Sequence, residues 1–180
     1  LHEAVRGGYA SIAVAITAAG ADPNLQDSSG NTPLHLVMPE ASRSEIFGIL
    51  LRAGSNPNKK DNYGETPLHI AARLGMSEDI VRDLVAAGAD VNERNKKGVT
   101  PLSLAIERKQ TAQARLFVKV GADIHAEDME DQTALSRAIK AGIELVEAIV
   151  TEETAQTRDS RGRTPLHVAV SLRADPAIAL

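Results

Sequence analysis

The sequence contains no cysteine and no tryptophan, and only 2% of its residues are aromatic. Without cysteine the chain has no disulfide, no thiolate zinc site and no cysteine nucleophile, although such a chain fits either redox compartment. The compartment therefore stays open, with the cytoplasm as the default. Because 43% of the residues are hydrophobic, a core must be built mainly from Ala, Leu, Ile and Val. This composition favours closely packed helices over a cavity around a bulky ligand.

The chain also has no excess of positive charge and no long apolar run. Its formal net charge is −4, whereas a nucleic-acid-binding protein is generally basic overall or carries a dominant basic stripe. We therefore expect no nucleic-acid partner. The longest apolar run, IAVAITAA at residues 12–19, falls short of the roughly 20 residues that span a bilayer. It predicts a buried helix, and no membrane insertion by this segment.

What the sequence does contain is one pentapeptide at a near-constant interval. The copies read TPLHL, TPLHI, TPLSL, TALSR and TPLHV, and they begin at Thr32, Thr66, Thr100, Thr133 and Thr164. The intervals between these threonines are 34, 34, 33 and 31 residues, and LHEAV at the start of the chain fits as a further, partial copy. A period of this size is typical of an array of stacked repeats.

A second motif keeps the same period. It reads GADPN, GSNPN, GADVN and GADIH, beginning at Gly20, Gly54, Gly88 and Gly121. Each copy stands seven residues before Asp27, Asp61, Asn95 or Asp128. Two motifs in a fixed phase are much harder to obtain by chance than one, so the repeat is a property of the whole chain.

This pair of motifs resembles the ankyrin repeat family across essentially the whole chain. The resemblance implies an all-α solenoid of stacked helix-turn-helix units with β-hairpin tips, and it implies a binding platform without catalysis. We predict a single array over residues 1–180. Its units are a partial repeat 1–26, full repeats 27–60, 61–94, 95–127 and 128–158, and a partial repeat 159–180.

Local signals agree with this arrangement. The pentapeptide Thr is a good N-cap, and the Pro that follows in four copies suits the first helical position. Ser42 with Glu45, and Ser77, mark starts of second helices, and Gly of the second motif suits a left-handed C-terminal cap. Pro39 predicts an early end for the first helix of repeat 27–60. Two equivalent rows predict the core: Leu34, Leu68, Leu102, Leu135 and Leu166, and Ala71, Ala105, Ala138 and Ala169.

Candidate catalytic and metal-binding residues have structural explanations. The four pentapeptide histidines, His2, His35, His69 and His167, occupy the same place in repeats at least one full repeat apart, so they would form a row instead of converging on a metal. The resemblance implies that they hydrogen-bond to the adjoining loop. The Asp and Asn pairs of the second motif are turn formers that lack the compact spacing of a calcium loop. We predict no catalytic residue, no metal and no cofactor.

The tips are the predicted recognition surface, because their sequence varies from copy to copy while the framework is constant. The residues predicted to bind a protein partner are Ser29, Asn31, Asn62, Tyr63, Glu65, Arg73, Lys96, Lys97, Val99, Glu130, Gln132, Arg161 and Arg163. Tyr63 is the expected anchor, since no apolar periodicity buries it. Solvated loops without a ligand would vary in the same way, and this alternative stays open.

Three functions are compatible with the sequence. The first is a non-catalytic scaffold, expected to be monomeric, that binds a protein through the tips and the concave first-helix surface. The second is a module that targets or positions a catalytic or membrane domain outside these residues, and the third is a spacer. We also expect the chain to be an excerpt from a longer array. Repeat 128–158 should be the weakest unit, because Asp131 replaces the tip Gly and Ala134 replaces the Pro.

Overall fold

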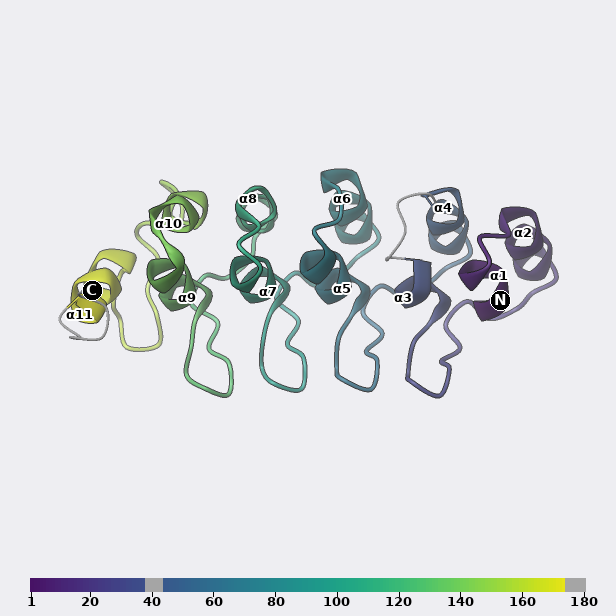
Figure 1. Ribbon diagram of the computed structural model, residues 1–180, viewed down its shortest axis with the longest axis horizontal. Coiled ribbons are helices and arrows are strands. Elements are labelled where there is room, and N and C mark those ends of the chain that lie inside the picture. Colours follow the sequence, from purple (N-terminus) through teal and green to yellow (C-terminus); the bar gives the residue numbers. More distant parts are fainter. Residues whose placement is uncertain (38–43, 174–180) are drawn as a thin grey trace.

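The computed structural model describes residues 1–37 and 44–173, and the helices of this part form two rows (Figure 1). The helices are α1 (His2–Arg6), α2 (Ala10–Ala18), α3 (Pro33–Val37), α4 (Ser44–Arg52), α5 (Pro67–Leu74), α6 (Glu78–Ala86), α7 (Pro101–Glu107), α8 (Thr111–Lys119), α9 (Ala134–Ala141), α10 (Ile143–Ile149) and α11 (Pro165–Arg173). No helix in these two ranges is both long and apolar enough to cross a membrane.

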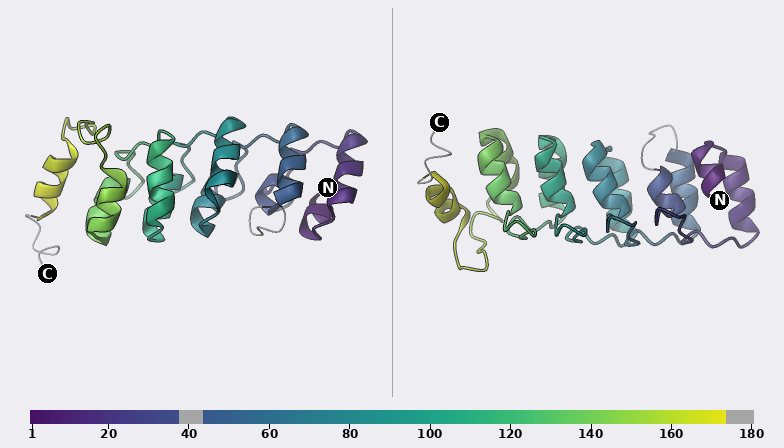
Figure 2. Two further views of the ribbon diagram at one scale, coloured as in Figure 1. Left: turned by 90° about the horizontal axis from the view of Figure 1, so that it is seen from above. Right: turned by 60° about the horizontal axis from the view of Figure 1, so that its bottom comes forward.

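The two rows correspond to the two helices of each repeat. The first helices α1, α3, α5, α7, α9 and α11 lie in the row nearer the loops, and α2, α4, α6, α8 and α10 lie behind them (Figure 1). Each first helix contacts the next, as α5 contacts α7 and α7 contacts α9. The views in Figure 2 show the repeats side by side along one axis, with the chain running from one end to the other. The predicted all-α solenoid is confirmed.

The predicted β-hairpin tips are turns without extended strands. We number the tips as residues 27–31, 61–65, 95–99, 128–132 and 159–163, from the first to the fifth tip. Within the described ranges, the one isolated β-bridge joins Glu127 to Thr133 at the base of the fourth tip. The tips project from the row of first helices (Figure 1).

Each first helix begins at the pentapeptide, but its Thr acts in two ways. At Thr100 and Thr133 the hydroxyl accepts a hydrogen bond from the backbone N–H of Ser103 or Ser136, as an N-cap should. In copies with His at that place, the hydroxyl instead lies against the ring, with Thr66 Oγ1 2.9 Å from His69 Nδ1. Thr66 and His69 form a capping box, in which the His69 ring also accepts from the backbone N–H of Thr66.

The second helices end as predicted and begin less regularly. Gly20, Gly54, Gly88 and Gly121 have φ between 85° and 95°, in the left-handed region that glycine adopts without strain. Ser77 occupies the N-cap of α6 but makes no side-chain cap hydrogen bond. The predicted start at Ser42 and the predicted stop at Pro39 lie outside the described residues.

The core lies between the rows and between successive repeats. Leu34, Leu68, Leu102 and Leu135 are at most 1% exposed, and the row Ala71, Ala105 and Ala138 is fully buried. Phe47 and Phe117 are buried as well, so two of the four aromatic residues belong to the core. The small Ala side chains allow neighbouring helices to approach closely, at roughly 8 to 10 Å between axes.

Two parts of the predicted core are exposed. Leu166 of α11 is 72% exposed, because α11 is the last helix that the structure describes and no described helix covers it. In α2 only Ala13 is buried, and Ile12 and Val14 are about half exposed. The prediction of a buried helix at residues 12–19 is therefore wrong, because α2 lies at the end of the described array, where it contacts α1 and α4 and no further described repeat covers its other side.

Candidate functional site

The tips have one common internal framework, built on the residue that begins each tip. The Oδ1 atom of Asp61 accepts hydrogen bonds from the backbone N–H groups of Tyr63 and Glu65, both at 2.8 Å. The other four tips repeat this pattern at Asp27, Asn95, Asp128 and Asp159. Because these bonds fix the backbone, the intervening side chains project from a rigid turn.

Backbone hydrogen bonds join neighbouring tips in the first part of the array. The N–H of Asn62 donates to Ser29, that of Lys96 to Tyr63, and that of Met129 to Lys97, at 3.0 to 3.1 Å. The close approach requires glycine: a Cβ on Gly64 would lie 2.7 Å from the backbone N of Lys96. In the described chain no backbone bond of this kind joins the fourth tip to the fifth. The four tips from 27 to 132 therefore form one continuous ridge.

The histidines join the repeats, as the resemblance implied. His35 and His69 lie buried, with Nε2 3.1 Å from the carbonyl oxygen of Glu65 and 3.0 Å from that of Val99. Burial lowers the pKa of both rings, and that of His69 to about 4. Both stay neutral at pH 7 and serve as structural hydrogen-bonding groups. Among the described residues, no group of three His, Cys, Asp or Glu could hold a metal ion.

A groove of about 560 Å³ runs between the tips and the first helices. On the tip side it is lined by Ser29, Tyr63, Lys96 and Lys97. On the helix side it is lined by Ile70 and Arg73 of α5, by Leu104 and Glu107 of α7, and by Arg108 beyond α7. Ile70 and Leu104 are less than a tenth exposed and form an apolar floor.

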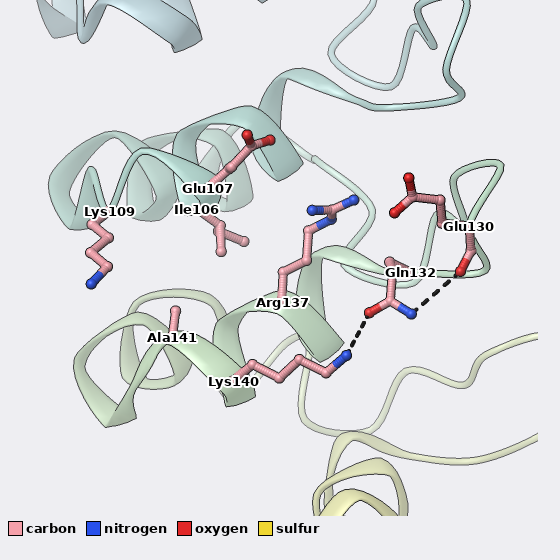
Figure 3. A pocket seen from close by; sticks show the side chains of 8 residues that line it. All are labelled: Ile106, Glu107, Lys109, Glu130, Gln132, Arg137, Lys140 and Ala141. Carbon is pink, nitrogen blue, oxygen red and sulfur yellow. Dashed lines mark hydrogen bonds between the residues drawn. The ribbon is translucent and has the colours of Figure 1, made fainter. Parts of the chain in front are cut away.

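A second hollow of about 480 Å³ continues the groove toward the fourth tip (Figure 3). It shares Glu107 with the first, and its other lining residues are Ile106, Lys109, Glu130, Gln132, Arg137, Lys140 and Ala141. Lys140 Nζ donates to Gln132 Oε1 at 2.9 Å, and Gln132 Nε2 donates to the Glu130 carbonyl at 3.3 Å (Figure 3). A third hollow shares Gln132 and Lys140 with the second and reaches Arg161 and Arg163 of the fifth tip.

Ion pairs hold two arginines of the groove in place. Arg73 of α5 pairs with Glu65 of the second tip at 2.9 Å, and Arg137 of α9 pairs with the buried Asp128 of the fourth tip. Burial alone would raise the pKa of Asp128, but hydrogen bonds from Arg137 and from the backbone N–H groups of Gln132 and Glu130 outweigh it and lower the pKa. Asp128 therefore stays ionised and fixes Arg137.

The structure brings most of the predicted partner-binding residues together. Eight of them line the first hollow: Ser29, Asn31, Tyr63, Glu65, Arg73, Lys96, Lys97 and Val99. Glu130, Gln132, Arg161 and Arg163 line the adjoining hollows. Asn62 lies outside all three, and its Nδ2 donates to the carbonyl of Ser28. Val99 is only 8% exposed, so its side chain offers a partner little surface.

The sequence analysis predicted the first-helix surface and Arg73, but it missed the other helix residues that line the groove. Ile70, Leu104 and Arg137 each stand four residues after the pentapeptide Thr, and Glu107 and Lys140 stand seven residues after it. In repeats 61–94, 95–127 and 128–158, residues at one or both of these positions line the hollows beside the tips. The repeat register therefore contained a usable signal, since equivalent positions in a solenoid share a face.

Comparison with known families assigns the fold. The family model for ankyrin repeats in three copies matches residues 1–95, 37–128 and 102–180, which together cover the whole chain. The chain therefore belongs to the ankyrin repeat family. Members of this family generally mediate protein–protein interaction and are generally non-catalytic. No curated protein matched the sequence.

Proposed function

We propose that this chain is a non-catalytic, monomeric scaffold that binds a protein partner through the tips and the first helices. The observation that carries the proposal is the groove between Tyr63, Lys96 and Lys97 on one side and α5 and α7 on the other. Its walls come from successive repeats, and the tips on one wall are joined by backbone hydrogen bonds. A preorganised wall loses little entropy on binding, which favours affinity.

The tip side chains are suited to recognition. Tyr63 is 73% exposed although its backbone is fixed by bonds to Asp61 and Lys96. An exposed aromatic side chain on a rigid turn supplies large contact area at low entropic cost. The same surface has no constellation of nucleophile, base and orienting group that would indicate catalysis.

Site-specific photo-cross-linking tests the proposal. A benzophenone amino acid is placed at Tyr63, at Lys97 or, as a control, at the exposed Arg115 of α8 on the opposite face. After irradiation in a lysate of the source cells, we expect one protein to be cross-linked from positions 63 and 97 and not from 115. Equal cross-linking from all three positions, or none from 63 and 97, would contradict the proposal. The molar mass of the purified chain, measured by light scattering, tests the proposed monomeric state.

A further inference from the structure

We propose that the groove binds an extended acidic segment of a protein, laid across the second, third and fourth tips. This inference rests on the proposed protein-binding function and adds the chemical class of the partner. The first two hollows are lined by seven basic and four acidic side chains, whereas the whole chain has a net charge of −4. These two hollows therefore have a local excess of positive charge, although the chain as a whole is acidic.

The opposite face carries a small excess of negative charge. The second helices α4, α6, α8 and α10 together hold six acidic residues (Glu45, Glu78, Asp79, Asp83, Glu144 and Glu147) and four basic ones (Arg52, Arg82, Arg115 and Lys119), a net charge of −2. These helices form the row away from the tips (Figure 1). The two hollows thus have an excess of basic side chains and the row of second helices a slight excess of acidic ones, so the long-range electrostatic attraction of an acidic chain favours the groove.

Most cations of the groove are available for a ligand. Arg73 and Arg137 are used by Glu65 and Asp128, but no ion pair recorded in the described residues involves Lys96, Lys97, Arg108, Lys109 or Lys140. Lys140 donates only to the neutral amide of Gln132. The acidic side chains of the two hollows without a recorded ion pair are fewer, namely Asp61, Glu107 and Glu130. An incoming carboxylate would therefore meet unpaired ammonium and guanidinium groups.

The groove also has an apolar component, which separates a protein segment from a simple polyanion. Ile70 and Leu104 form the floor, and the ring of Tyr63 stands beside them on the tip wall. An extended peptide can place apolar side chains on this floor and carboxylates on the basic rim. Single-stranded nucleic acid would instead need several aromatic rings for base stacking, and Tyr63 is the one aromatic residue among the lining residues.

The length of the segment follows from the repeat. Packed helices lie roughly 8 to 10 Å apart, and an extended chain advances about 3.3 Å per residue, so each repeat accommodates about three residues. A segment that crosses the second to the fourth tip and both flanks therefore has about twelve residues. In the polyproline II conformation, which has three residues per turn and a rise of about 3.1 Å per residue, a repeating Glu-Glu-Leu peptide of that length presents one apolar side chain to each repeat.

The test is direct binding of that fluorescein-labelled Glu-Glu-Leu peptide, followed by fluorescence anisotropy. The groove variant is Lys96→Glu with Lys97→Glu, and the matched control is Arg115→Glu with Lys119→Glu on α8, which makes the same change in net charge on the opposite face. We expect the groove variant to weaken binding at least about tenfold and the control to change it less than about twofold. Binding by the unaltered chain should weaken as salt is raised.

Two further probes decide between ligand classes. A Lys-Lys-Leu peptide of the same length and a single-stranded oligothymidylate should each bind at least about tenfold more weakly than the acidic peptide. Equal loss in both charge variants, no binding of the acidic peptide, or tighter binding of the oligonucleotide would each overturn the inference. If cross-linking from positions 63 and 97 succeeds while the acidic peptide fails, the scaffold proposal stands and only the acidic partner is rejected.

Discussion

The Nε2 atom of His69 lies 3.0 Å from the carbonyl oxygen of Val99 in the next repeat, while Nδ1 of the same ring accepts from the backbone N–H of Thr66. One neutral ring therefore bonds to the backbone at the start of its own helix, α5, and to the backbone of the third tip. Both bonds need the tautomer with hydrogen on Nε2 and none on Nδ1. Protonation of Nδ1 would remove the acceptor that Thr66 uses, so this relationship depends on pH.

The first prediction is that stability falls as the pH falls from about 6.5 to about 4. The pKa of His69 is lowered from 6.5 to about 4, so between these values the unfolded chain binds the proton and the folded chain does not. The stability from neutral His69 is present above 6.5 and lost as the pH falls, by about 3 kcal/mol at full effect. Urea unfolding at several pH values measures this loss.

The matched variant is His69→Ser, because Ser103 and Ser136 occupy the same place in the next two repeats. The variant should be less stable at pH 7 and should show a smaller decrease between pH 6.5 and 4. His35, whose pKa is also lowered by burial, accounts for part of the remaining slope. An unchanged slope in His69→Ser would contradict the assignment.

The second prediction concerns Tyr63 as the anchor for the partner. Tyr63→Ala should weaken binding of the acidic peptide or of the cross-linked partner at least tenfold, since truncating an aromatic hot spot typically costs at least about 2 kcal/mol. The midpoint of thermal unfolding should hardly change, because the side chain is 73% exposed. Met129→Ala is the control: Met129 is 76% exposed and lines none of the three hollows. A lower midpoint with unchanged affinity would make Tyr63 a structural residue.

The third prediction compares two tip glycines with nearly equal backbone angles. Gly64 and Gly162 have φ of 77° and 75°, but a Cβ on Gly64 would meet the backbone N of Lys96 at 2.7 Å, whereas a Cβ on Gly162 would meet nothing within 4 Å. Gly162→Ala should cost about 1 to 2 kcal/mol for the left-handed backbone alone. Gly64→Ala should cost more, because the ridge must open. Equal losses in urea unfolding would show that the tips are not in tight contact.

The fourth prediction is that Asp131→Gly stabilises the protein. Asp131 has φ of 55° at the place where the other tips have glycine. Replacing it should relieve about 1 kcal/mol of backbone strain, less the entropy that glycine loses on folding. Differential scanning calorimetry should give a higher midpoint. A decrease would mean that Asp tolerates this conformation without cost.

The fifth prediction is that residues 131–158 open more readily than residues 66–90. The fourth tip has no backbone bond to the fifth, and Ser136 takes the place of the histidine that joins earlier repeats. The side-chain hydrogen bonds across this interface join His125 to Thr157 at 2.8 Å and Ser160 to Glu127 at 3.4 Å. Since solenoid stability is a sum over repeats and interfaces, amide exchange should be faster there. Equal protection of the two ranges would refute this.

The repeat itself could be predicted from sequence because its signals are local. Thr and Pro at a helix start, Gly at a helix end and Asp at a turn act through the backbone within a few residues, and their recurrence fixed the period. The buried Leu and Ala rows followed from that register. The left-handed backbone of Asp131 could be predicted for the same reason, because the other tips have glycine at the equivalent position.

Only the tertiary structure decided which residues of neighbouring repeats contact one another and which of them line the groove. Sequence could not show that the side chain of Val99 is buried while its carbonyl oxygen accepts a hydrogen bond from His69. It also could not show that most of α2 is exposed despite its apolar composition. Nor could it show that Arg137 and Lys140 of α9 extend the groove begun by Tyr63 and Lys96. These relationships join residues about thirty or more positions apart, so they depend on how one repeat rests on the next, which no local preference specifies.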